Sequence, residues 1–125
     1  MQRSVEDVLQ SLSDVLFPEE IGEAPVTIHS RSSEGDTPLH VMAWRKDVDG
    51  ARILLAAGAD VDAIGDMDET PLHVAIGQED IEMVELLLGS GARVTFRSEF
   101  GSTALEEADA KGGVMQQSVR RHAST

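Results

Sequence analysis

Apolar residues near the N-terminus recur with the spacing of one face of an α-helix. From Val5 they follow at i, i+3, i+4, i+7, i+10 and i+11, which is the pattern of an amphipathic helix. The members of this stripe are Val5, Val8, Leu9, Leu12, Val15 and Leu16. Ser4 is the predicted N-cap, and Pro18 would end the helix. We expect this helix to shield the first apolar layer that follows it.

Farther along, the apolar pattern repeats with a period of 33 residues. The letters Thr-Pro-Leu-His begin at Thr37 and again at Thr70, and a weaker copy, "TALEEA", begins at Thr103. The first two copies continue through a short polar turn into a leucine-rich segment, "RILLAAGA" or "VELLLGSGA". A fixed period of this length is typical of a solenoid in which each repeat is one supersecondary unit.

Signals for helix ends fall at the same place in each copy. Thr37 and Thr70 are predicted N-caps, and a proline follows each of them at the first helical position, where a missing N–H costs nothing. A histidine in each first turn would bond the local backbone or the neighbouring repeat's threonine. Gly58 and Gly91 follow the second helices, as expected of left-handed C-terminal caps.

The two full copies resemble consecutive ankyrin repeats. Their sequences are "TPLHVMAWRKDVDGARILLAAGADVDAIGDMDE" and "TPLHVAIGQEDIEMVELLLGSGARVTFRSEFGS", and the family's repeat has 33 residues with a T-P-L-H-x-A signature. The resemblance implies an all-α repeat fold, an ankyrin solenoid of helix-turn-helix units with β-hairpin loops, about three repeats and an N-terminal capping helix. The structural motif residues are Thr37, Pro38, Leu39, His40, Thr70, Pro71, Leu72 and His73.

The resemblance also divides the chain into units. They are an N-terminal capping helix and loop at 1–25, a leading hairpin at 26–36, repeat one at 37–69, repeat two at 70–102, a truncated C-terminal capping repeat at 103–121 and a tail at 122–125. In the capping repeat, "TALEEADA" would form the first helix and "VMQQSVRR" a shortened second helix. We expect the tail to fray.

The chain departs from the family pattern at a few positions. Lys46 and Glu79 stand where ankyrin repeats favour glycine between the two helices, at a cost near 1 kcal/mol if the turn is left-handed. Asp68 replaces the glycine of a hairpin turn. Gly50 lies inside the second helix of repeat one and should weaken it. Repeat one is therefore expected to be the less stable internal unit.

Composition and charge narrow the classes of partner. The formal net charge is −13, which argues against binding nucleic acid or an anionic membrane and favours encounter with a basic protein. The same charge could serve solubility alone. No run of apolar residues is long enough for a membrane span, and the N-terminus lacks the pattern of a secretion signal. There is no cysteine. We expect a cytoplasmic protein.

Candidate catalytic and metal-binding motifs are weak. The segment "DVDAIGDMDETP" is similar to a calcium loop, but Ile64 and Pro71 stand at its fifth and twelfth positions, where ligands are required. Two of the four histidines, His40 and His73, belong to the repeat motif, and no HExxH or H-x-x-x-H spacing occurs. No nucleophile elbow or phosphate-binding glycine loop is present. The sequence predicts no enzyme, metal site or cofactor.

The resemblance implies partner binding through the loop tips and the exposed side of each first helix. Carried over by register, the candidate partner-binding residues are Glu34, Asp36, Trp44, Arg45, Asp66, Met67, Glu69, Gln78, Glu99 and Phe100. The same register adds Gly77, Ala110 and Lys111. Aromatic anchors ringed by charge are typical of a binding hot spot with a polar rim. The alternative is that Trp44 packs between helices and Phe100 covers a hairpin.

Three functions remain open at this point. The first is a non-enzymatic protein-protein interaction module that binds a basic partner through an acidic concave face and is a monomer when free. A small acidic ankyrin protein is similar to bacterial immunity or inhibitor proteins, which cover the positive cleft of a toxin or enzyme. The second is a scaffold or adaptor that links two partners. The third is a structural protein that associates with itself, with Trp44 buried in a dimer.

Overall fold

The computed structural model describes residues 3–12, 27–32 and 34–123. Most helices follow one another in pairs joined by tight turns, and longer loops join the pairs. In chain order the elements are α1 (Val5–Gln10), α2 (Pro38–Arg45), α3 (Val48–Ala56), the 3-10 helix η2 (Asp66–Asp68), α4 (Pro71–Gly77), α5 (Ile81–Gly89), α6 (Ala104–Lys111) and α7 (Gly113–Ala123).

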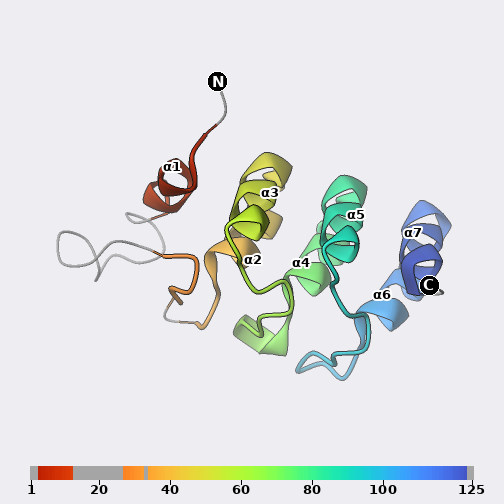
Figure 1. Cartoon of the computed structure of the whole chain (residues 1–125). Helices are drawn as coiled ribbons and strands as arrows, with labels where there is room; N and C mark the ends of the chain where they lie inside the picture. The colour runs from red at the N-terminus through yellow and green to blue at the C-terminus, as the bar shows by residue number, and fades with distance from the viewer. Residues whose placement is uncertain (1–2, 13–26, 33, 124–125) are drawn as a thin grey trace.

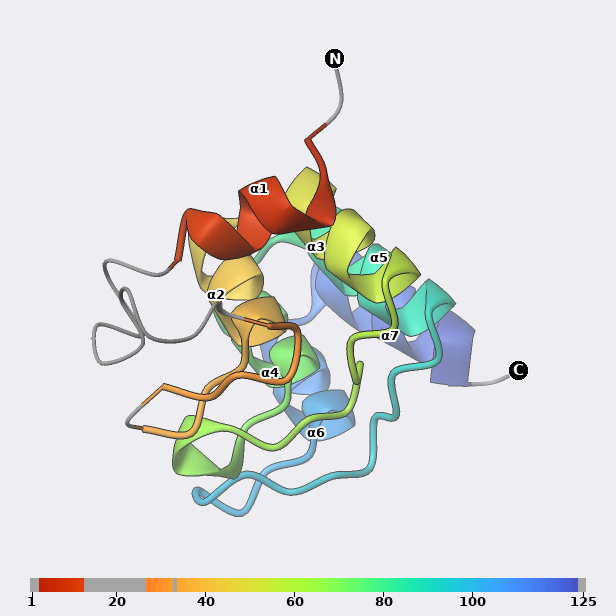
Figure 2. The ribbon, with the colours of Figure 1, turned by 60° about the vertical axis from the view of Figure 1, so that its left-hand side comes forward.

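The helix pairs stack side by side into a short solenoid (Figure 1). Viewed from the N-terminal end, the first helices α2, α4 and α6 lie one behind another, and the second helices α3, α5 and α7 form another row (Figure 2). The loops before α4 and α6 project together on one side (Figures 1 and 2). The predicted all-α repeat fold is therefore confirmed.

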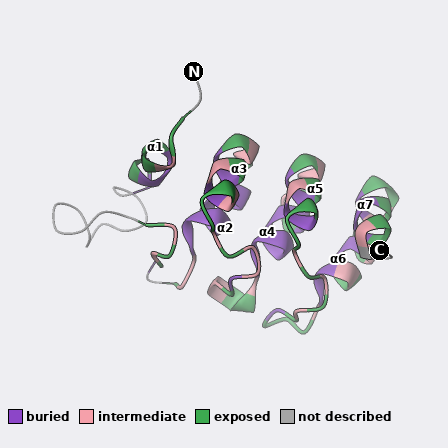
Figure 3. Cartoon of the chain, viewed as in Figure 1, coloured by how far each residue is buried: buried purple, intermediate pink, exposed green. Residues whose placement is uncertain are grey.

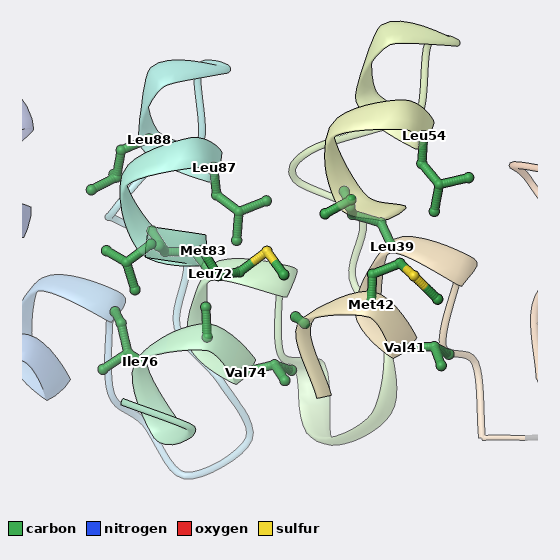
Figure 4. Packing of buried hydrophobic residues seen from close by; sticks show 14 of the residues in the cluster. Leu39, Val41, Met42, Leu54, Leu72, Val74, Ile76, Met83, Leu87 and Leu88 are labelled. Carbon is green, nitrogen blue, oxygen red and sulfur yellow. The ribbon is translucent and has the colours of Figure 1, made fainter. Parts of the chain in front are cut away.

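The core consists of apolar layers between the helices. Leu39 and Leu72 from the first helices and Leu54 and Leu87 from the second helices are at most 1% exposed. Figure 3 shows that the buried positions lie on the helix sides that face one another, and Figure 4 shows these leucines in the packed cluster. Burying one such side chain stabilises the fold by roughly 1.5–3 kcal/mol.

The loops between the pairs keep the turn of a hairpin without its strand arms. Ser32, Gly65 and Ser98 each donate a backbone N–H to the carbonyl four residues on, at 2.8, 2.9 and 2.9 Å. The described residues contain no strand, and an isolated bridge joins Arg97 to Thr103. The predicted β-hairpin arms are wrong in this respect, because each accepting residue directly precedes a helix-capping threonine and leaves no length for a return strand.

Each first helix begins at a capping threonine, as predicted. The backbone N–H of Thr37 donates to Nδ1 of His40 at 3.1 Å. Thr70 and His73 form the same contact at 3.2 Å. In the third copy a glutamate, Glu106, replaces the histidine and accepts the N–H of its own capping threonine at 2.9 Å. These bonds satisfy backbone donors that a helix start would otherwise leave unpaired.

The motif histidines also join one repeat to the next. Because Nδ1 of His40 accepts a hydrogen bond, its proton is on Nε2, which donates to the carbonyl of Glu69 at 2.9 Å. His73 makes the equivalent bond to the carbonyl of Ser102 at 3.2 Å. Each bond between repeats thus ends on the residue before the next threonine. The predicted alternative, in which the histidine bonds the neighbouring repeat's threonine, is wrong. Burial lowers the pKa of His40, so the neutral ring is favoured.

The turns inside the helix pairs are left-handed. Lys46 and Glu79 have φ of 59° and 57°, in the region that a side chain disfavours. Both positions therefore carry the predicted cost, about 1 kcal/mol relative to glycine. Gly58 and Gly91 follow the second helices with φ of 102° and 97°, so these predicted C-terminal caps are confirmed.

The packing around α3 explains why a glycine stands at position 50, inside a helix. A Cβ at this residue would lie 2.5 Å from Sδ of Met42 and 2.9 Å from Oδ2 of Asp47, so both side chains would have to shift to accommodate it. In the next repeat the equivalent residues are Ala75 and Met83, and all four are buried. One methionine fills this helix contact in each repeat, from α2 in one and α5 in the other (Figure 4). The predicted lower stability of repeat one stays a prediction, and the structure adds a packing contact that depends on this glycine.

The N-terminal helix is capped and tied to the stack. Ser4 and Asp7 form a reciprocal capping box. Arg3 donates to both carboxylate oxygens of Asp47, the N-cap of α3, at 3.0 and 2.7 Å. The helix ends at Gln10, earlier than the apolar stripe predicted. The end of that stripe and Pro18 lie outside the described residues.

The C-terminal helix is longer than predicted. α7 has 11 residues, whereas α3 and α5 each have 9, so the predicted shortened helix is wrong. His122 belongs to α7, and its ring bonds the carbonyl of Ser118 at 3.1 Å, so the predicted fraying does not begin there. Arg121 reaches Glu85 on α5 at 3.0 Å, which adds a contact between neighbouring second helices. Residues 124 and 125 lie outside the described residues.

Candidate functional site

The large apolar side chains of the predicted site lie at the surface. Trp44 is 52% exposed, Met67 46% and Phe100 69%. The alternative in which Trp44 packs between helices is therefore wrong for this chain by itself. Ile64, which the predicted site did not include, is also exposed and lies in the same loop as Met67. Exposed apolar groups of this kind mark interaction surfaces when they lie together.

Two neighbouring loop tips are joined by a backbone bond. The N–H of Glu99 donates to the carbonyl of Met67 at 2.8 Å, which holds the tip that carries Phe100 against the preceding tip. We call residues 64–69 and 97–102 the tip pair. Met67 and Asp68 have φ of 59° and 57°. Non-glycine residues in this region cost roughly 1–2 kcal/mol each, so the first of these tips is held in a strained form that presents Met67 to solvent.

An acid row lies at the base of these loops, close to the starts of the first helices; its members are Asp36, Asp66, Glu69 and Glu107. Oδ1 of Asp36 accepts the N–H of Asp66 at 2.9 Å and so joins successive loops. Burial raises the pKa of Glu69, and the nearby charges of Glu107, Asp36 and Asp66 raise it further. Burial also raises the pKa of Glu107. A cation placed on this row would relieve the repulsion.

Glu107 was missed by the sequence prediction. It stands in α6 where α2 and α4 have the buried residues Val41 and Val74. The signal was present in the repeat alignment, since a glutamate replaces an apolar residue at one position of the first helix. Its interaction with Glu69 in the preceding repeat required the tertiary structure.

The structure separates the predicted partner-binding residues into two groups. The loop group comprises Glu34, Asp36, Asp66, Met67, Glu69, Glu99 and Phe100. The helix-end group comprises Trp44, Arg45 and Gln78, which lie at the C-terminal ends of α2 and α4, away from the loops that precede these helices. The site is thus not one uniform acidic face.

The loop arginines are held by the chain itself. Arg31 donates to the carbonyls of Gly35 and Ile64, both at 2.7 Å. Arg97 donates to the carbonyl of Gly101 at 2.6 Å and pairs with Glu106 at 3.0 Å. These contacts hold Arg31 against its own loop and the next one, and Arg97 against its own loop and the start of α6. The acidic side chains of the loop tips are therefore the charged groups that can pair with a charge on a partner.

The described residues contain no group of three potential metal ligands. The motif histidines use both ring nitrogens on threonines and loop carbonyls. A shallow hollow of about 360 Å³ lies between α3 and α5, and it is lined by Arg52, Leu55, Ala56, Ala59, Val61, Leu86 and Ser90. Apart from Arg52 and Ser90, its side chains are apolar.

Stacked helix pairs, exposed loop tips and capping threonines at a 33-residue period define a short helical repeat protein that presents a surface. The family model for ankyrin repeats matches residues 7–98 in three copies. The chain belongs to the ankyrin repeat family, whose repeats mediate binding to other proteins and are generally non-catalytic. A comparison with curated proteins finds none that matches. No helix in the described residues is long and apolar enough to cross a membrane.

Proposed function

We propose that this ankyrin protein binds a basic surface of a single protein partner and inhibits that partner. The observation that carries the proposal is the tip pair, where the Glu99–Met67 backbone bond joins two loops that each carry an exposed apolar side chain, next to the acid row. An apolar anchor with a charged rim is the usual composition of a binding hot spot. The remaining candidate loop residues, Glu34 and Asp36 among them, form the rim.

Electrostatics supports a basic partner. The chain has a formal net charge of −13, and the loop arginines are occupied by contacts within the chain. Glu69 and Glu107 repel one another, so a lysine or arginine placed between them lowers the free energy of the complex. Rim charges act mainly on the association rate, which therefore falls as the salt concentration rises.

Inhibition is favoured over scaffolding by size and charge. A chain of this length offers area for one partner of standard interface size, and its net charge of −13 suits the covering of a positive cleft. The protein would act in the cytoplasm as a free monomer. Nucleic acid and membranes are excluded as partners in this proposal because the acid row would repel phosphate groups.

Affinity capture from the source cell's lysate at low and high salt tests this function. A basic protein that is captured at low salt and lost at high salt is the expected result, and its own activity should fall when the ankyrin protein is added in equal amounts. Replacing both Met67 and Phe100 by serine should remove capture. Val114→Ser is the matched control, since Val114 is 62% exposed on α7, outside the tip pair. Equal capture by the wild type, the Met67 and Phe100 double variant and Val114→Ser would refute the proposal.

A further inference from the structure

The loop that joins repeats one and two, residues 64–69, contains two left-handed residues that are not glycine. Met67 and Asp68 have φ of 59° and 57°. The residues equivalent to Asp68 in the neighbouring loops are Gly35 and Gly101, which adopt a left-handed backbone at little cost. Strained residues persist only where the surrounding structure over-determines their conformation. We call residues 64–69 the middle loop, which must therefore be held in this form by contacts with its neighbours.

The preceding loop and the start of α2 hold the middle loop at three points. Arg31 donates to the first carbonyl of the loop at 2.7 Å, and the ring of His40 donates to its last carbonyl at 2.9 Å. Between these two bonds, Oδ1 of Asp36 accepts the backbone N–H of Asp66 at 2.9 Å. Because Asp66 directly precedes Met67, the bond to Asp36 is the one closest in sequence to the left-handed pair.

Gly65 leaves space in the middle loop for the carboxylate of Asp36. The φ of Gly65 is −115°, so a left-handed backbone is not the reason for a glycine here. A Cβ at this position would collide with Oδ1 of Asp36 and would lie 2.7 Å from Nε2 of His40. In the neighbouring loops the equivalent residues are Ser32 and Ser98, and each accepts a backbone N–H of its own loop. The middle loop lacks such a side chain, and Asp36 supplies the acceptor from outside.

The middle loop in turn holds the next loop. The carbonyl of Met67 accepts the N–H of Glu99 at 2.8 Å, and Phe100 is the next residue. Glu69 is the equivalent of Asp36, but the N–H of Glu99 bonds the Met67 carbonyl rather than a carboxylate. A middle loop released from Asp36 would leave the strained left-handed form and lose this bond. The three loops are thus connected in series, first by a side chain and then by the backbone.

We propose that Asp36 is a positioning residue of the partner-binding surface. Its carboxylate holds the middle loop in the form that presents Met67, and through the bond to Glu99 it also sets the tip that carries Phe100. This inference rests on the proposed function, in which Asp36 contributes a rim charge, and it assigns a second and larger role to the same side chain. Two anchors that are already in place cost less ordering on binding. Loss of the Asp36 oxygen should therefore weaken binding more than loss of its charge.

Amide hydrogen exchange of the full chain, followed by NMR, tests the connection between the loops. Asp36→Asn keeps an oxygen acceptor without the charge, whereas Asp36→Ala removes both. In Asp36→Ala the N–H groups of Asp66 and Glu99 should both exchange at least about tenfold faster, and in Asp36→Asn they should stay within about threefold of wild type. Gly65→Ala should act like Asp36→Ala, because its Cβ displaces the carboxylate. Gly89→Ala is the matched control, since a Cβ there would meet open space on α5.

Binding of the basic protein that the wild type captures from lysate separates positioning from charge. Glu34 lies in the same loop as Asp36, and its carboxylate accepts from Ser32 rather than from the middle loop. Asp36→Ala should lower the affinity by at least about fivefold relative to Glu34→Gln, and Asp36→Asn should match Glu34→Gln. Circular dichroism would verify that each variant remains folded, and Gly65→Ala gives the same comparison if Asp36→Ala does not fold.

Two results would overturn the inference. One is unchanged exchange at Glu99 in Asp36→Ala and Gly65→Ala, because the loops would then not be connected through Met67. The other is equal binding by Asp36→Asn and Asp36→Ala, which would leave Asp36 as a rim charge alone. Both results leave the proposed function standing if capture still depends on Met67 and Phe100. Conversely, a wild type that captures no basic protein refutes the proposed function, and exchange at Glu99 then decides alone whether Asp36 sets the position of the loops.

Discussion

The helix contact inside each repeat is filled by one methionine, which comes from α2 in repeat one and from α5 in repeat two. We therefore predict a strong energetic coupling between residues 42 and 50 of repeat one. Met42 is fully buried, and a side chain on Gly50 would collide with its sulfur, which lies 2.5 Å from the position of a Cβ. Met42→Ala should cost about 2–5 kcal/mol through lost burial and a cavity. Gly50→Met should cost about 1–3 kcal/mol through overpacking, partly offset by a gain in helix propensity of up to about 1 kcal/mol.

The double variant should be close to wild type in stability. Met42→Ala combined with Gly50→Met recreates the arrangement of Ala75 and Met83, which is fully buried in the next repeat. We expect the free energy of unfolding to return to within about 1 kcal/mol of wild type, which corresponds to a coupling of at least about 1 kcal/mol. Urea unfolding followed by far-ultraviolet circular dichroism measures all four proteins.

Additivity would refute this reasoning. If the double variant loses the sum of the two single losses, the two repeats do not accept the methionine from either helix, and Gly50 is required for another reason. A Cβ at residue 50 would also lie 2.9 Å from Oδ2 of Asp47, the N-cap of α3, so the Asp47 side chain must shift in the variants that carry methionine there. In the next repeat Asp80 accepts the N–H of Met83, so the same type of cap accommodates a methionine at the equivalent position.

Three further outcomes follow from the caps and turns. Burial lowers the pKa of His40, so the unfolded chain takes up the proton first, and stability should fall as the pH drops below the ordinary value of 6.5; urea titrations across that range, with His40→Gln for comparison, measure this. Lys46→Gly should raise the free energy of unfolding by up to about 1 kcal/mol, whereas Gln78→Gly, at φ −80°, should not. Arg3→Ala should raise the pKa of Asp47 towards its ordinary value, which NMR titration detects, and cost less than about 1 kcal/mol. An unchanged Asp47 titration would contradict that last expectation.

Much of the fold could be predicted from the sequence because its signals are local. A threonine before a proline starts a helix wherever it occurs, and a glycine or a strained residue after a helix marks a left-handed turn. The period of 33 residues then placed Trp44 and Phe100 on the outer surface without knowledge of any contact. The strand arms were predicted wrongly, because the family pattern does not state how few residues separate each loop turn from the next capping threonine.

The sequence predicted which positions are exposed on the loops and first helices, but not which of these residues lie together. Register placed acidic residues and exposed apolar anchors on the loops, and it placed Arg45 and Gln78 on the first helices. It did not separate Arg45 and Gln78, at the C-terminal ends of α2 and α4, from the loop residues that precede these helices. Glu107 and Ile64 entered the site only when their neighbours were known.

The sequence by itself thus determined the repeat, the helix caps and the left-handed turns, since each depends on a few adjacent residues. Tertiary structure alone decided which distant residues share a contact. It brought the sulfur of Met42 close to Gly50 and formed the backbone hydrogen bond between Glu99 and Met67. It also placed the carboxylate of Glu107 near enough to raise the pKa of Glu69. Close packing and charge repulsion act over a few ångströms in space, whatever the separation along the chain.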